Sequence, residues 1–173
     1  VFESSHHLLE RFNNSSNKTQ FAEHEFLRLC ELFEKITSSA KTKIILFNFY
    51  EINDYSFGNQ STKIPSAFIY QLRLINVKLN KYCSQNHRVA IFDVSSIQNK
   101  IGSDNLFHTA LYVNYGMLIS NEYSDFIANH IVTIILAQNA QFKKCVILDL
   151  DNTLWGGIIG DDGIENIQLG NLG

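Results

Sequence analysis

The chain has 173 residues, a length that suits one domain and part of a second. Apolar residues make up 45% of the chain and the mean hydropathy is −0.06, which is ordinary for a soluble globular protein with a substantial core. The formal net charge is −3 and no basic run occurs, which argues against binding to nucleic acid or to an anionic membrane surface. No apolar run is long enough to span a bilayer.

The three cysteines, Cys30, Cys83 and Cys145, are odd in number and show no paired spacing. This usage fits a reducing cytoplasm better than a disulfide framework. No signal peptide is visible and Val1 is not a start methionine, so we expect a cytoplasmic protein of which this chain is a piece. Cys145 falls in a predicted strand and is expected to be buried, which leaves Cys83 as the more accessible thiol.

The first twenty residues contain the pair His6-His7 and an Asn/Ser-rich stretch over 13–17 that is typical of a loop. Adjacent residues on a helix do not face one site, and two histidines without further partners make an incomplete metal site. We therefore do not expect this pair to bind metal. Apolar residues recur at helical spacing over 20–37, which predicts an amphipathic helix.

Two buried strands and a long helix are predicted in the next part of the chain. Uninterrupted apolar runs indicate the strands, and Pro65 is favoured in the first turn of a helix. The predicted elements are a strand over 43–50, a loop over 51–59, a helix from Pro65 to about residue 86, a strand over 88–94 and a helical turn over 95–100.

After an irregular stretch over 101–121, the pattern predicts a helix over 124–139 and a third strand from Lys144. The alternation of strands and helices indicates an α/β protein with a parallel sheet. We predict a three-layer, flavodoxin-like parallel sheet with flanking helices over residues 1–142. A second domain then begins at 143–173 with one strand and a small hairpin.

Two acidic residues, Asp149 and Asp151, follow the third predicted strand. Open α/β sheets hold ligands at the carboxyl ends of their strands, and residues i and i+2 of an extended segment share a face. Two carboxylates in one site repel each other unless a divalent cation separates them or one keeps its proton. Mg²⁺ needs few protein carboxylates and takes other ligands from water and phosphate. One carboxylate can then attack phosphorus, while the other acts as general acid and base.

Residues 149–153 (DLDNT) match the first motif, DxDxT, of the haloacid dehalogenase (HAD) superfamily. The longer string over 149–163 (DLDNTLWGGIIGDDG) resembles the FkbH-type branch, whose members carry DLDNTLWGGVIGDDG. The resemblance implies that Asp149 is the nucleophile and a Mg²⁺ ligand. It implies that Asp151 is the general acid/base and a second metal ligand through its backbone carbonyl.

The same resemblance implies that Thr153, with Asn152, positions the loop and the phosphate, and that the predicted hairpin forms a flap over the site. It implies a phosphorylated small-molecule substrate. The founding members of the branch transfer a glyceryl group from 1,3-bisphosphoglycerate to an acyl carrier protein, with loss of phosphate. The alternative for a bare D-x-D pair is a helix cap and turn without chemistry.

Residues 1–142 resemble the SGNH-hydrolase-like domain that precedes the HAD domain in FkbH-type proteins, through segments 44–59, 66–73 and 91–100. Asn53, with Asp54 beside it, falls where SGNH enzymes place an oxyanion-hole Asn. The family pattern is incomplete, because no Gly-Asp-Ser block is present and Glu51 replaces the expected Gly. The nearest acid–His pair is Asp104 and His108, at the wrong spacing, and the sequence leaves open whether the first strand is present.

Three functions therefore remain open. The first is an FkbH-like HAD-type phosphatase or acyltransferase, the second a non-catalytic SGNH-like module that binds a carrier protein or substrate, and the third an SGNH esterase. The chain ends about twenty residues past the nucleophile motif, before the Lys and second acidic pair of HAD enzymes. We therefore expect this fragment to be inactive and to bind Mg²⁺ weakly. A lone strand and hairpin cannot bury their apolar faces alone, so a swapped dimer through 144–173 is an expected alternative.

Overall fold

The computed structural model of the protein describes residues 2–39, 41–115, 118–141, 145, 147–168 and 170. The chain forms two compact units, unit 1 (Val1–Asn139) and unit 2 (Ala140–Gly173). Unit 1 carries nearly all of the regular structure, while unit 2 consists of turns, short bridges and one four-residue helix.

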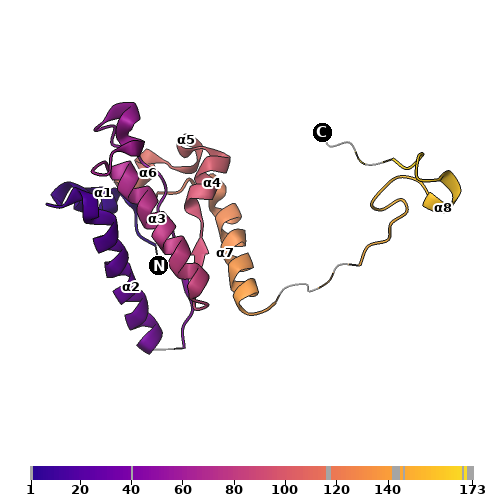
Figure 1. The fold of residues 1–173 in the computed structure, drawn as a ribbon, viewed down its shortest axis with the longest axis horizontal. Coiled ribbons are helices and arrows are strands. Elements are labelled where there is room, and N and C mark those ends of the chain that lie inside the picture. Colours follow the sequence, from indigo (N-terminus) through magenta and orange to yellow (C-terminus); the bar gives the residue numbers. More distant parts are fainter. Residues whose placement is uncertain are drawn as a thin grey trace. The chain divides into compact units, whose positions relative to one another are not determined.

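Helices dominate the described residues of unit 1, and the strands β1 and β2 lie among them (Figure 1). In chain order its elements are α1 (Ser5–Asn14), α2 (Phe21–Ser39), β1 (Ile44–Phe47), α3 (Phe68–Gln85), β2 (Val89–Phe92), α4 (Val94–Ile101), α5 (Ser103–Leu106), α6 (Thr109–Tyr115) and α7 (Ser124–Gln138). Short 3₁₀ turns cover Lys18–Gln20, Gly58–Lys63 and Asn121–Tyr123. Unit 2 contributes α8 (Ile159–Asp162).

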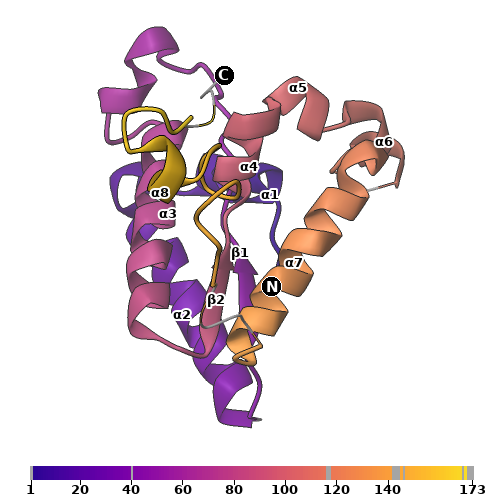
Figure 2. The ribbon, with the colours of Figure 1, turned by 90° about the vertical axis from the view of Figure 1, so that its right-hand side faces the viewer.

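The strands β1 and β2 are parallel, with Ile44 opposite Val89 at the start of the register, and α3 connects them. Alternate side chains of β1 enter opposite cores, as the two-residue period of a strand requires. Ile44 and Leu46 join a cluster with buried residues of α1, α2 and α3, whereas Phe47 packs against a second cluster that includes residues of α4 and α7. Helices α2 and α3 thus lie on one face and α7 on the other (Figure 2).

Buried amide side chains fix the segments that leave the two strands. Asn48 is 2% exposed, donates to Asp93 Oδ1 at 2.7 Å and accepts from the Val94 N–H at 2.7 Å. Asn76 of α3 accepts from the Phe49 N–H at 2.9 Å and donates to the Phe49 carbonyl at 2.6 Å. These contacts satisfy backbone groups that would otherwise be buried without partners, and they hold the carboxyl ends of both strands in one place.

Three helices and two strands that were predicted from the length and spacing of apolar residues are confirmed. The predicted helix over 20–37 is α2, and the predicted helix over 124–139 is α7. The helix predicted from Pro65 to about residue 86 is α3, but it begins only at Phe68, so Pro65 lies before its first turn. The predicted strands over 43–50 and 88–94 are present as β1 and β2, each shortened to four residues. Helix α1 was not predicted, and Ser4 begins it because its Oγ accepts the His6 N–H at 3.1 Å.

The predicted fold class, a three-layer parallel sheet of at least three strands followed by the first strand and flap of a Rossmann-like domain, is wrong. The sheet in the described residues has only the two strands β1 and β2. No strand forms at Cys145 or over 147–150, where Ile147 is 93% exposed and Leu150 is 51% exposed. An apolar run forms a strand only where a neighbouring strand accepts and donates its backbone hydrogen bonds. The residues of the run do not show whether such a neighbour is present.

In unit 2 the predicted small hairpin is replaced by α8, which ends at Asp162, with Gly163 as the residue that caps it. The extended pairing that does form joins Gly156 and Gln168, whose N–H and carbonyl groups exchange two bonds of 2.8 Å. None of the helices in the described part of the chain has both the length and the apolar character that crossing a bilayer requires.

Candidate functional site

The acidic motif lies in a loop of unit 2. Asp149 is exposed, and its Oδ1 accepts the N–H of the next residue, Leu150, at 2.8 Å. A turn of helical type follows, because the Leu154 N–H donates to the Leu150 carbonyl at 3.0 Å. The first acid is therefore exposed to solvent, while the second acid lies inside the turn.

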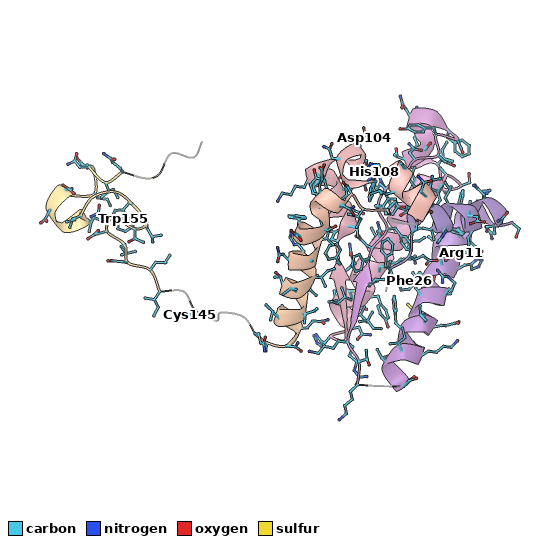
Figure 3. All side chains as sticks on the ribbon, turned by 180° about the vertical axis from the view of Figure 1, so that it is seen from behind. Arg11, Phe26, Asp104, His108, Cys145 and Trp155 are labelled. Atoms are coloured by element: carbon cyan, nitrogen blue, oxygen red, sulfur yellow. The ribbon has the colours of Figure 1, made fainter. Side chains whose placement is uncertain are left out.

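Asp151 is half-buried and has two hydrogen-bond donors on one oxygen. Trp155 Nε1 donates to Asp151 Oδ1 at 3.1 Å, and the Ile159 N–H donates to the same atom at 3.2 Å. Figure 3 labels Trp155 within unit 2. The sequence indicated Asp151 as general acid/base but gave no role to Trp155, although the spacing of four residues would place both on one side of a helical turn.

Asn152 shapes the loop. Its φ of 52° lies in the left-handed region, which Asn tolerates better than most residues. Its Oδ1 accepts the Gly157 N–H at 3.0 Å, which closes the loop over 152–157. Gly157 has φ 106°, and a Cβ there would lie 3.0 Å from Asp162 Oδ2, so only glycine fits without movement.

A cavity of about 600 Å³ adjoins the motif loop. Asn152 and Thr153 line it together with Trp155 and Gln168. The loop thus brings two of the residues predicted to bind phosphate to one cavity, whereas Asp149 and Asp151 do not line it.

The carboxylate of Asp149 and the backbone carbonyl of Asp151 have the chemistry that Mg²⁺ prefers, since both supply hard oxygen ligands. Among the described residues, no group of three or more His, Cys, Asp or Glu side chains could hold a metal ion. Mg²⁺ is commonly bound by one or two carboxylates with water and phosphate completing the octahedron, so these two residues fit as part of such a site.

In unit 1, Asn53 and Asp54 lie in the loop after β1 and make contacts within that loop. Asn53 Oδ1 accepts the Tyr55 N–H at 2.9 Å, and Asp54 Oδ2 accepts from the Ser56 hydroxyl at 2.6 Å. Tyr55 has φ 55°, so these side chains stabilise a tight turn. The same loop borders a cavity of about 520 Å³ at the carboxyl end of the sheet, lined among others by His6, Glu51, Asn53, Arg73 and Gln98.

Asp104 and His108 do not form an acid–His pair with a serine. His108 Nδ1 accepts the Leu111 N–H at 3.3 Å, so this histidine serves helix α6, while Asp104 lines another cavity. Figure 3 labels both residues. Within the described residues no hydrogen bond joins a serine hydroxyl to a histidine ring. Burial, together with the charge of His7, lowers the pKa of His6.

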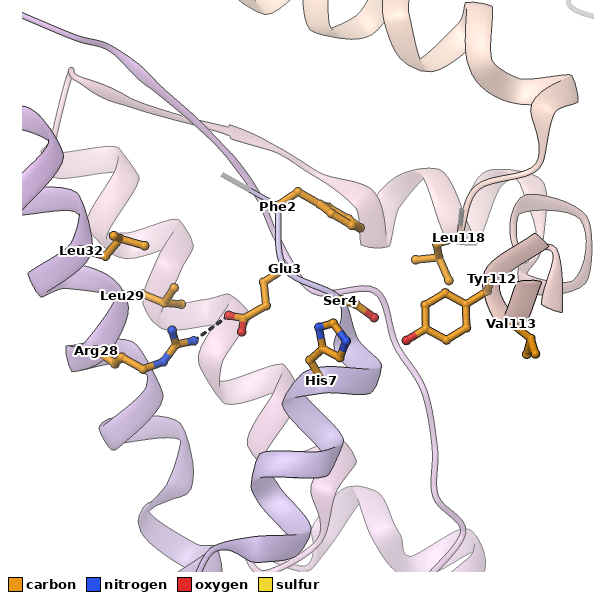
Figure 4. A pocket seen from close by; sticks show the side chains of 10 residues that line it. All are labelled: Phe2, Glu3, Ser4, His7, Arg28, Leu29, Leu32, Tyr112, Val113 and Leu118. Atoms are coloured by element: carbon orange, nitrogen blue, oxygen red, sulfur yellow. Dashed lines mark hydrogen bonds and ion pairs between the residues drawn. The ribbon is translucent and has the colours of Figure 1, made fainter. Parts of the chain in front are cut away.

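A further cavity of unit 1, of about 790 Å³, lies between the N-terminal segment, α2 and α6 (Figure 4). Glu3 and Arg28 form an ion pair of 2.6 Å on its wall. Arg11 and Glu25 extend this pair into a network with as many acids as bases, so the cavity carries no excess charge for an ionic ligand. None of the residues predicted to form a site lines it.

A family model described as FkbH, N-terminal domain, matches residues 1–136. The chain belongs to the FkbH N-terminal domain family. The resemblance inferred from the motif string is therefore confirmed, and the matched residues lie within unit 1, before the motif loop.

A solved relative of this FkbH-type chain is the N-terminal part of the protein BF1531 from Bacteroides fragilis, described as containing a phosphatase domain and as complexed with Mg. The identity is 34% and the TM-score 0.79, over 99% of this chain and 45% of that one. The chain thus spans less than half of the length of that relative. No curated protein matches it.

The cysteines of the FkbH-type chain differ in exposure from the sequence-based expectation. Cys145 is exposed, whereas Cys83 and Cys30 are half-buried, so the expectation that Cys83 is the more accessible thiol is wrong. Burial, with a smaller effect of Cys30, raises the pKa of Cys83 to about 11. Helix α3 turns its last residues toward α2, where Cys83 packs against the core cluster.

We predict that Cys145 reacts first with a thiol reagent. At pH 8 a thiol with the pKa of Cys83 is only about one part in a thousand thiolate, and thiolate is the reactive form. A time course with a chromogenic disulfide should show one fast equivalent per chain. Cys145→Ser should remove the fast phase and Cys83→Ser should leave it. A fast phase that survives Cys145→Ser would contradict the assignment.

Proposed function

We propose that the protein to which this chain belongs is a HAD-type phosphatase or acyltransferase that acts on a phosphorylated small molecule. The observation that carries the proposal is the motif loop over 149–157, in which one acid is exposed and the second is held by two N–H donors. The FkbH family match and the phosphatase domain of the Bacteroides relative support it.

In this proposal the Asp149 carboxylate attacks the phosphorus of an acyl phosphate. The bond between phosphorus and the acyl oxygen breaks, an aspartyl-phosphate forms and the carboxylic acid product leaves. Asp151 protonates the leaving oxygen where protonation is needed and then removes a proton from water, which releases inorganic phosphate and restores Asp149. Asn152 and Thr153 hold the loop and border the cavity beside it.

Magnesium is the cofactor we propose, with Asp149 and Asp151 among its protein ligands. When bound, such a cation would neutralise charge on the phosphoryl oxygens, while the side chain of Asp151 stays available for proton transfer. The Mg with which the Bacteroides relative is complexed supports this choice. Magnesium removal by a chelator should therefore abolish activity, and its return should restore it.

The substrate class can be tested with the full-length product of the reading frame that encodes these residues. Transfer requires the carrier thiol to attack the acyl carbon of 1,3-bisphosphoglycerate and displace the C1 phosphate, so in that reaction Asp149 would attack the phosphorus of the C3 phosphate ester and the alcohol would leave. For a transferase we therefore expect a glyceryl group without phosphate on the carrier, found by mass spectrometry. Free phosphate with an unmodified carrier would instead indicate simple hydrolysis. Neither product, in the presence of Mg²⁺, would overturn the proposal.

A second candidate function concerns unit 1. We propose that residues 1–142 act as an SGNH-like binding module for a carrier protein or substrate and perform no ester hydrolysis. The cavity beside Asn53 at the carboxyl end of the sheet supports binding, and the hydrogen bonds of the described serines and histidines argue against a triad. Ester turnover that a serine-directed inhibitor blocks would contradict this interpretation.

A further inference from the structure

The indole of Trp155 lies four residues after Asp151 and contacts its carboxylate directly. The distance from Trp155 Nε1 to Asp151 Oδ1 is 3.1 Å, and this side-chain contact is partly buried. The second donor to that oxygen is the Ile159 N–H, at the start of α8. Within the described part of unit 2, both donors act on Oδ1, which leaves Oδ2 as the oxygen available for proton transfer.

The backbone of the loop produces this contact. The Leu154 N–H donates to the Leu150 carbonyl at 3.0 Å, so one helical turn separates Asp151 from Trp155. The loop is then closed between Asn152 and Gly157 by a backbone bond of 3.3 Å and a side-chain bond of 3.0 Å. The indole is therefore held in place by the geometry of the motif loop rather than by a deep apolar core.

A carboxylate that exchanges protons needs one oxygen fixed and the other accessible. A free Asp side chain rotates, and each rotation removes the proton-carrying oxygen from the reacting atoms. Two N–H donors on Oδ1 select one orientation, in the same way that partners of a metal ligand orient that ligand. Phenylalanine at 155 would fill part of the space but donate no hydrogen bond.

We propose that Trp155 is a positioning residue for Asp151, which fixes the rotation of the carboxylate and keeps Oδ2 in place for proton transfer. The catalytic part of this inference rests on the proposed function, whereas the contact itself can be tested without any activity. Trp155 also lines the cavity that Asn152 and Thr153 border, so a ligand there would meet the same indole.

The contact can be observed in the 173-residue chain, because Trp155 is its only tryptophan. A ¹⁵N–¹H spectrum should show one indole N–H resonance, and Asp151→Ala, which removes the acceptor, should move it and speed its exchange with water. Asp161→Ala is the matched control, since it removes an acid of α8 and should leave the resonance in place. An indole resonance that is indifferent to Asp151→Ala would overturn the contact.

The positioning role can be measured in the full-length protein. Replacing Trp155 by β-(benzothiophen-3-yl)alanine keeps both rings and removes only the N–H donor, so folding is not at risk. We expect kcat for acetyl phosphate hydrolysis to fall about 10-fold and KM to change less than about twofold. A 10-fold fall in kcat is the size of effect expected when a reacting group loses a partner that orients it. Trp155→Phe should show the same division between kcat and KM.

The outcomes separate this inference from the proposed function. Suppose that the wild-type protein hydrolyses acetyl phosphate, that Asp149→Asn is inactive and that the benzothiophene variant keeps the wild-type kcat. The positioning role is then wrong, whereas the proposed function stands. If the indole resonance responds to Asp151→Ala but the wild-type protein has no phosphatase or transferase activity, the proposed function fails, and with it the catalytic role of Trp155.

Discussion

Asp149→Asn should abolish phosphate release by the full-length protein, with a fall in kcat of at least about 10³-fold. The exposed carboxylate of Asp149 is the proposed nucleophile, and an asparagine amide cannot form an aspartyl-phosphate. The substitution changes neither the size of the side chain nor the acceptor that meets the Leu150 N–H, because the amide oxygen can take the place of Oδ1. The measurement is phosphate release from acetyl phosphate with Mg²⁺ present.

Asp161→Asn is the control for this prediction. Asp161 is an exposed acid in α8, so the variant makes the same change of charge in the same unit without touching the motif loop. It should keep wild-type kcat and KM. The nucleophile assignment fails if Asp149→Asn retains more than a tenth of the wild-type kcat, or if rapid-quench experiments find a phosphorylated protein in that variant.

The parts of the fold that follow from local periodicity could be predicted from the sequence. The uninterrupted apolar run at Ile44–Phe47 and the helical spacing of α2 need only neighbouring residues to be recognised. The third strand, predicted from Lys144, does not form at Cys145 or over 147–150, and its absence there could not be predicted, because the apolar run before Asp149 looks the same whether or not another strand lies beside it. The pairing of two strands joins residues that lie far apart in the chain, and the apolar run does not identify which residues would pair with it.

The same limit applies to the site. The order Asp149, Asp151, Thr153 pointed to phosphoryl chemistry because those residues lie close together in the chain. The half-buried state of Asp151 and its bond to Trp155 depend on the left-handed Asn152 and the closure at Gly157, which a residue pattern does not specify. Buried amides were also missed, since Asn and Gln usually indicate surface or loop positions.

Gln71→Met should lower the free energy of unfolding of unit 1 by about 3 kcal/mol. Gln71 of α3 is 0% exposed and connects two distant segments. Its Oε1 accepts the Ala22 N–H at the start of α2 at 2.8 Å, and its Nε2 donates to the carbonyls of Pro65 at 2.6 Å and Thr19 at 3.1 Å. Methionine keeps the unbranched shape but leaves the buried Ala22 N–H without an acceptor, a loss that the extra apolar contact does not offset.

Urea unfolding followed by circular dichroism of the helices is the suitable measurement, because Trp155 lies in unit 2 and its fluorescence does not report on this core. Gln85→Leu, at the exposed end of the same helix, is the matched control and should change stability by less than about 0.5 kcal/mol. Equal urea midpoints for the Gln71→Met and Gln85→Leu variants would contradict this prediction. They would mean that water replaces the hydrogen bonds of Gln71, so that the first turn of α2 does not need the Gln71 side chain of α3 as an acceptor.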